Sequence, residues 1–97
     1  MNQVIQLIED NLSDHIWDPK VIVVYSASTC GMCRILRPKL FYVNEEYKVV
    51  IVDGSRHFNS NKFYPTHIQW FPTIAYFEKG VYIKDIPKQE IEEGLWN

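Results

Sequence analysis

The motif Cys30-Gly31-Met32-Cys33 constrains this chain most, and it holds the only two cysteines among the 97 residues. An apolar run at residues 21–25 precedes it and a helical pattern follows it. If Cys30 opens that helix, its sulfur lies near unpaired backbone N–H groups and the positive end of the helix dipole, which both favour a thiolate. Cys33 returns to the same helix face, where it can attack a mixed disulfide at Cys30. This setting predicts a redox pair.

Two other interpretations of the cysteines stay open at this point. Small buried cysteines can be inert packing residues. A zinc site needs about four ligands, and the only further candidates besides carboxylates are His15, His57 and His67, which lack the paired spacing of a second ligand half. We therefore expect no metal, and we expect these histidines to be surface or hydrogen-bonded residues rather than catalytic ones.

Length and composition indicate one domain, residues 1–97, with enough apolar residues (46%) for a compact core. The net charge of -2 gives no electrostatic reason to expect nucleic acid or an anionic membrane as a partner. The first 14 residues lack the basic start and unbroken apolar stretch of a signal peptide, and no run reaches transmembrane length. We expect a cytoplasmic monomer whose thiols stay reduced unless catalysis cycles them.

The first half of the chain alternates helical and strand patterns. Residues 1–12 are predicted as a helix, 21–25 as a strand buried on both faces, and 30–42 as a helix that Pro38 should kink. The expected core residues of the first helix are Val4, Ile5, Leu7, Ile8 and Leu12. Those of the second are Ile35, Leu36, Leu40 and Phe41.

The second half begins with another buried strand at residues 48–53. A short helix at 59–64 is plausible, and the strands 74–77 and 81–83 form a hairpin around Gly80. Pro87 suits the first turn of a last helix, with Ile91 and Leu95 facing inward. The order predicts an α/β fold with a mixed four-stranded sheet and helices on both faces.

Three features in the right order make the chain resemble the thioredoxin family across about residues 15 to 95. The first is the strand, the Cys30-Gly31-Met32-Cys33 motif and the helix; the second is Pro38 within that helix. The third is Phe71-Pro72-Thr73 ahead of an apolar strand, which looks like the family's turn with a cis proline facing the cysteines.

The resemblance implies a thioredoxin-like fold and a thiol–disulfide oxidoreductase acting on protein disulfides. Cys30 would be the nucleophile and Cys33 the resolving thiol, with no cofactor besides the pair itself. The backbone of Phe71 would pair with an extended substrate segment, and its bulk could reshape the groove. The implied substrate-binding residues are Gly31, Met32, Phe71, Pro72 and Thr73. The electron donor would be a thioredoxin-reductase-like protein or a dithiol.

The chain also departs from the family pattern. The family's buried Asp, six residues before the first cysteine, is Val24 here, and its basic partner falls at about Val49. Thr29 and Ser26 stand where tryptophans are usual, and Met32 replaces a proline between the cysteines. Without the Asp, Cys33 must lose its proton to water or to a substrate group. We expect slower resolution or a different pH profile rather than loss of activity.

Two further alternatives remain. A glutaredoxin-like, glutathione-linked reductase would show a Gly-Gly-Asp type site after the last strand, which Asp85-Ile86-Pro87 does not supply. A binding module with little catalysis would fit the missing Asp and tryptophans. Arg34 and Arg37 either stabilise a thiolate at Cys30 or form a solvated basic face. The tryptophans, expected mainly to pack in the core, are Trp17, Trp70 and Trp96.

Overall fold

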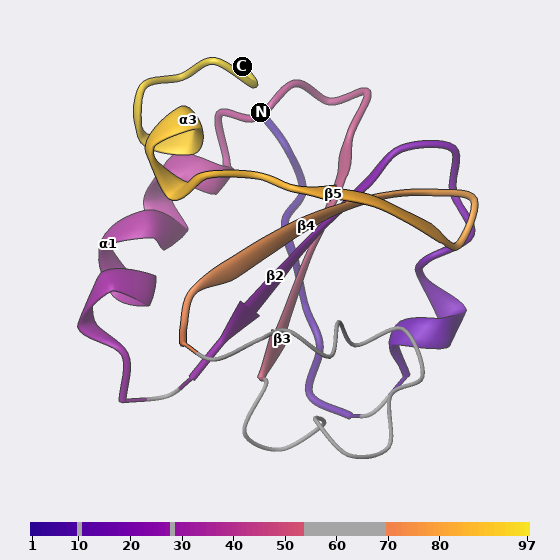
Figure 1. The fold of residues 1–97 in the computed structure, drawn as a ribbon, viewed down its shortest axis with the longest axis horizontal. Helices are drawn as coiled ribbons and strands as arrows, with labels where there is room; N and C mark the ends of the chain where they lie inside the picture. Colours follow the sequence, from indigo (N-terminus) through magenta and orange to yellow (C-terminus); the bar gives the residue numbers. More distant parts are fainter. Residues whose placement is uncertain (10, 28, 54–69) are drawn as a thin grey trace.

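The computed structural model describes residues 1–9, 11–27, 29–53 and 70–97. The elements are β1 (Ile5–Gln6), the 3-10 turn η1 (Leu12–Asp14), β2 (Val21–Ser26), α1 (Gly31–Leu40), β3 (Lys48–Asp53), β4 (Thr73–Glu78), β5 (Val81–Asp85) and α3 (Lys88–Glu92). They form one sheet with the strand order β1-β3-β2-β4-β5 (Figure 1). The α/β prediction is confirmed, with five strands instead of four. The predicted helix at 59–64 and two of the histidines, His57 and His67, lie outside the described residues.

The central strand is β2, as its run of β-branched residues predicted. Val23 lies opposite Val50 of the parallel β3 and opposite Ala75 of the antiparallel β4. Side chains alternate between two cores, one on each face of the sheet. The helix-side core includes Ile22, Val24, Leu36, Leu40, Ile74 and Ile91. The opposite core includes Leu7, Leu12, Ile16, Val23, Tyr25 and Phe77.

In the part of the chain that is described, α1 and α3 both cover the helix-side core (Figure 1). The opposite face is covered by the segment that contains Leu7, Leu12 and Ile16. The prediction of helices on both faces is therefore not met by these residues. Among these residues, that segment contributes the 3-10 turn η1 and no α-helix.

The N-terminal segment corrects the predicted helix at residues 1–12. It runs extended, with Ile5 opposite Val50 in a parallel pair, and the Leu7 N–H donates to the Ile51 carbonyl at 2.9 Å. Ile8, a predicted core residue, is 75% exposed. The apolar spacing suits a helix, but the edge of β3 offers unpaired backbone groups, and pairing with them satisfies the segment's own N–H and C=O groups.

Helix α1 is shorter than predicted and buries fewer residues. It spans Gly31–Leu40, with Phe41 as its C-cap. Leu36 and Leu40 are buried as predicted, whereas Ile35 is 57% exposed. Leu36 and Leu40 are four residues apart and share a face, from which Ile35 is turned by about 100°. Pro38 lies inside the helix, and the expected kink remains a prediction.

The last helix begins after Pro87, as predicted, and buries Ile91. Leu95 was predicted to face inward and is 67% exposed instead. The chain turns at Gly94, whose φ is +75°, and this left-handed residue changes the direction of the residues after it. Trp96 packs against the helix-side core in place of Leu95. The centroid of its ring lies 5.1 Å from the centroid of the Tyr47 ring.

The hairpin between β4 and β5 turns on Lys79 and Gly80, whose φ angles are +50° and +82°. Two positive φ angles are typical of the tight turn that matches the twist of paired strands. A Cβ on Gly80 would overlap the ring of Trp17. We expect Gly80→Ala to lower the free energy of unfolding by about 2 kcal/mol, from backbone strain and the displaced ring. Urea denaturation would measure this.

Gly31→Ala is the matched control for that substitution. A Cβ on Gly31 meets nothing within 4 Å, and the residue is in the first turn of α1. Alanine should be neutral or slightly stabilising there. Equal stability losses in the two variants would contradict the explanation from the turn and Trp17.

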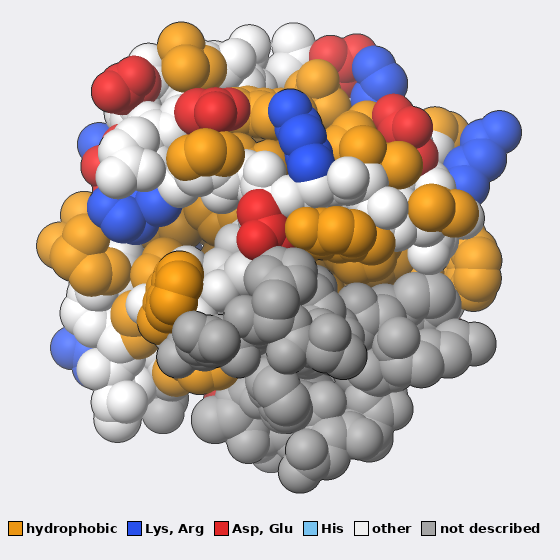
Figure 2. Space-filling view, in the orientation of Figure 1, with side chains coloured by type: hydrophobic (Ala, Val, Ile, Leu, Met, Phe, Trp, Pro, Cys, Tyr) orange, Lys and Arg blue, Asp and Glu red, His pale blue; other side chains and the backbone are white. Residues whose placement is uncertain are grey.

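Strand β5 is exposed along its whole length, and Val81, Tyr82 and Ile83 are its large apolar residues. Figure 2 shows hydrophobic side chains on this face interspersed with basic and acidic ones, so that neither one apolar patch nor one sign of charge dominates. None of the described helices is both long and apolar enough to cross a membrane.

Two tyrosines next to carboxylates should make stability fall in alkali. Partial loss of hydration and the hydrogen bond to Asp85 raise the pKa of Tyr82 to about 12, although its side chain stays 42% exposed, and burial and Glu78 also raise the pKa of Tyr76. An unfolded tyrosine ionises near pH 10, so the unfolded state loses protons first and the free energy of unfolding falls as pH rises above about 10. Urea denaturation at about pH 9 and pH 11 checks this. Tyr82→Phe should reduce the loss, and an unchanged loss would argue against Tyr82.

Candidate redox site

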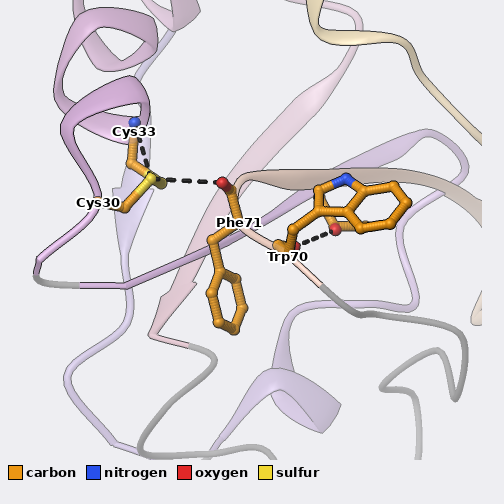
Figure 3. Close-up of a disulfide and its surroundings, with 5 residues drawn as sticks. Cys30, Cys33, Trp70 and Phe71 are labelled. Carbon is orange, nitrogen blue, oxygen red and sulfur yellow. Dashed lines mark hydrogen bonds between the residues drawn. A yellow bond between two sulfur atoms is a disulfide. The ribbon is translucent and has the colours of Figure 1, made fainter.

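The two cysteines lie at the start of α1, where the chain turns from the central strand into the helix. The Cys30 N–H donates to the Ala27 carbonyl at 3.1 Å, and Cys30 is the N-cap of α1. Its sulfur accepts a hydrogen bond from the Cys33 backbone N–H at 3.2 Å (Figure 3). The two residues are joined by a disulfide, with 5.3 Å between their Cα atoms. A sulfur at this position takes the place of a capping oxygen, which favours negative charge on it.

The turn before β4 faces the same sulfur. The Phe71-Pro72 bond is cis, as the resemblance implied. The Phe71 carbonyl oxygen lies 3.5 Å from Cys30 Sγ, a contact that the reduced thiol can make as a donor. Figure 3 shows the Phe71 ring pointing away from the disulfide, and it packs against the opposite core. The backbone of Phe71 therefore faces the sulfur, whereas its ring does not fill the space over it.

A groove of about 690 Å³ runs along the cis-proline turn and includes Met32, the residue before Cys33, although neither cysteine lines it. Of the predicted substrate-binding residues it brings together Met32, Phe71, Pro72 and Thr73, whereas Gly31 does not line it. Its far wall is the junction of β5 and α3, with Asp85 and Lys88. The sequence analysis did not assign either residue to the site.

Trp70 also lines this groove, although core packing was its main predicted role. Its side chain is 68% exposed, and its carbonyl accepts a hydrogen bond from Thr73 Oγ1 at 2.8 Å. Its place directly before the Phe71-Pro72 turn indicates in the sequence that it could line the groove, although core packing is the favoured interpretation there. Trp17 is also exposed, and Trp96 alone among the three packs in a core as predicted.

A cleft of about 270 Å³ lies beside Cys33. Arg34 and Arg37 line it together with Cys33, and neither arginine lines the groove at the cis-proline turn. Gln6 and Asp53 are on its rim as well, and Arg37 Nη1 donates to Gln6 Oε1 at 2.5 Å. Sequence reasoning assigned Asp53 no role, although it ends the strand parallel to the one that leads to the motif.

Val24 stands where the family's acid is expected, and it is 2% exposed. It lies opposite Ile51 in the sheet, and Val49, the position expected for the family's basic partner, lies two residues earlier on the same buried face of β3. Val24 and Ile51 form part of the wall of the cleft beside Cys33. This wall offers no group that exchanges a proton.

Among the described residues, no group of three or more His, Cys, Asp or Glu side chains could hold a metal ion.

Comparisons with known proteins agree with this geometry. The Thioredoxin family model matches residues 3–97. A thioredoxin from Buchnera aphidicola is 26% identical over an alignment 103 positions long. The alignment spans 98% of this chain and 95% of that protein. Thioredoxin NaTrxh from Nicotiana alata superposes with a TM-score of 0.76 at 17% identity, over 97% of this chain and 90% of that one. The oxidised thioredoxin from Plasmodium falciparum gives 0.72 at 20% identity, over 94% and 97%.

The solved structures are below 25% identity and bear on the fold alone, whereas the family match extends over nearly the whole chain. The family and the Cys30–Cys33 disulfide at this spacing together support thiol–disulfide oxidoreductase chemistry. The chain belongs to the thioredoxin family.

Proposed function

We propose that this chain is a protein-disulfide reductase in which Cys30 is the nucleophile and Cys33 the resolving thiol. The observation that carries the proposal is the position of the Cys30 sulfur. It accepts the Cys33 backbone N–H at the start of α1 and lies 3.5 Å from the backbone of the Phe71-Pro72 turn. The sulfur is thus held between a group that favours a thiolate and a backbone that can align a substrate segment.

The reaction follows from the two sulfurs. The Cys30 thiolate attacks one sulfur of a substrate disulfide, a mixed disulfide forms, and the other substrate sulfur leaves as a thiolate that takes up a proton. Cys33 then attacks the Cys30 sulfur, which closes the Cys30–Cys33 disulfide and releases the second substrate thiol. Two electrons pass from the pair to the substrate, and a dithiol donor returns them.

The groove lined by Met32, Trp70 and the Phe71-Pro72-Thr73 turn supports a peptide segment as the substrate. An extended segment could pair with the turn's backbone, while the exposed Trp70 and Met32 contact an apolar side chain next to its cysteine. The proposal needs no prosthetic group, because the two sulfurs carry the electrons. It includes a thioredoxin-reductase-like or dithiol donor and a reducing compartment such as the cytoplasm.

The test is the reduction of a model protein disulfide by dithiothreitol, with and without this protein. We expect clear acceleration at catalytic concentrations. Repeating the assay with glutathione as the donor separates the glutaredoxin-like alternative, which predicts the larger acceleration with glutathione. No acceleration by a folded protein with two titratable thiols would favour a binding module instead.

A further inference from the structure

The cleft beside Cys33 has no part in the chemistry proposed so far. It holds about 270 Å³, room for several water molecules, since each occupies about 30 Å³ in the liquid. Its inner wall is apolar at Val24 and Ile51, and its rim is polar at Gln6, Arg37 and Asp53. Cys33 is also one of its lining residues.

The fold brings these residues together from four elements, β1, β2, α1 and β3. Asp53 lies opposite Ser26 in the parallel pair of β3 with β2, so both are at the carboxyl edge of the sheet, next to the turn that leads to Cys30. Arg34 and Arg37 follow Cys33 along α1. The hydrogen bond from Arg37 to Gln6 joins α1 to β1 across the cleft.

The resolving step needs a group that accepts the Cys33 proton. An ordinary thiol has a pKa near 8.5 and is only about 3% ionised at pH 7. Cys33 must therefore lose its proton as it attacks, and Val24 cannot accept it. Asp53 is the one carboxylate among the described residues that line the cleft. The charged residues that line the cleft together with Cys33 are Arg34 and Arg37 from α1 and Asp53 from β3.

We propose that Asp53 takes the Cys33 proton through water in this cleft, a role that deepens the proposed function and rests on it. As the Cys33 sulfur attacks the Cys30 sulfur of the mixed disulfide, its proton passes through water to the Asp53 carboxylate. The Cys30–Cys33 bond forms, the bond from Cys30 to the substrate breaks, and the electron pair leaves with the substrate sulfur, which is protonated by solvent. Asp53 then returns its proton to solvent. Because it acts through water, Asp53 is a positioning residue.

The test is a single-turnover reaction of the reduced protein with 4,4′-dithiodipyridine, a neutral disulfide whose thiol product absorbs light. Attack by Cys30 releases the first product and resolution by Cys33 releases the second, so the two steps are followed separately. In Asp53→Asn we expect the first step to stay within about twofold of wild type and the second to slow at least about tenfold at pH 7. The difference should disappear near pH 10, where Cys33 ionises without help.

The outcomes distinguish an Asp53 that accepts the Cys33 proton from an Asp53 that acts on Cys33 only through its charge. Removing a negative charge near Cys33 lowers its pKa, so an Asp53 that acted only through its charge would make resolution faster in Asp53→Asn. Faster resolution, an unchanged pH profile, or equal slowing of both steps at all pH values would overturn the proposal. Asp14→Asn, on the exposed turn η1, is the matched control and should behave as wild type. Asp53→Glu should restore part of the rate.

Failure of this proposal is distinct from failure of the proposed function. A wild-type protein that does not accelerate the reduction of a protein disulfide refutes the function itself. A wild-type protein that does, together with an Asp53→Asn variant that resolves normally, refutes only the role of Asp53.

Discussion

Cys30→Ser should abolish the reduction of a protein disulfide, leaving only the rate of dithiothreitol alone. Serine is nearly isosteric, but its hydroxyl stays protonated at neutral pH and does not attack a disulfide. The Cys30 sulfur is the one that accepts the Cys33 N–H at the helix start, so no other described group can take over its position. The measurement is the turnover rate in the dithiothreitol assay, with thermal unfolding to verify that the variant is folded.

Cys33→Ser should separate the two roles. Cys30 can still attack, but no thiol follows, so the substrate remains attached through a mixed disulfide. Mass spectrometry of the reaction mixture should show this adduct in Cys33→Ser and not in Cys30→Ser. An adduct that forms equally in both variants would contradict distinct roles for the two cysteines. One that forms only at Cys33, in Cys30→Ser, would reverse the assignment of nucleophile and resolving thiol.

Val24→Asp should destabilise the protein by about 3–5 kcal/mol at pH 7, the usual effect of a buried charge without a partner. Val24 is 2% exposed and lies in the helix-side core. Small domains unfold with only about 5–15 kcal/mol, so this single change removes a large part of the stability. Urea denaturation measures the loss. The acid typical of the family is therefore expected to be costly in these surroundings.

The pH dependence of the stability of Val24→Asp shows whether a buried charge causes the loss. Burial raises the pKa of a carboxyl at position 24 above its unfolded value of about 3.9. The unfolded state then releases its proton first as pH rises, so the variant's stability falls between about pH 4 and pH 7 relative to wild type. Val24→Ala, which loses about 2 kcal/mol through the cavity it leaves, should show no such pH dependence. A Val24→Asp variant as stable as wild type at pH 7 would mean that the cleft already solvates a charge there.

Reduction by this chain would proceed with a resolving cysteine whose surroundings differ from the family pattern. The acid that the family places behind the second cysteine is replaced by an apolar wall, and polar groups lie instead at the rim of the cleft. This arrangement keeps the centre of the sheet apolar. In the proposed relay, Cys33 exchanges its proton with solvent and with Asp53, so we expect the resolution step to depend more on pH than the attack by Cys30 does.

Several elements could be predicted because their signals are local. The buried strands β2 and β3 follow from runs of β-branched residues, and the hairpin follows from Gly80 between two apolar runs. The redox pair follows from two cysteines at the start of a helix. In each case neighbouring residues alone determine the backbone conformation, so the sequence contains enough information.

The tertiary structure decided what depends on distant partners. Residues 1–8 carry a spacing that suits a helix, yet they run extended because the free edge of β3 is there to pair with them. The exposure of Trp70 and the placement of Arg34 and Arg37 beside Cys33 likewise depend on which elements pack next to them. The sequence by itself determined the reacting sulfurs and the strands that hold them. Only the packed fold decided which residues surround each sulfur, because Gln6, Cys33 and Asp53 are brought to one cleft by sheet register and helix packing, which no local pattern encodes.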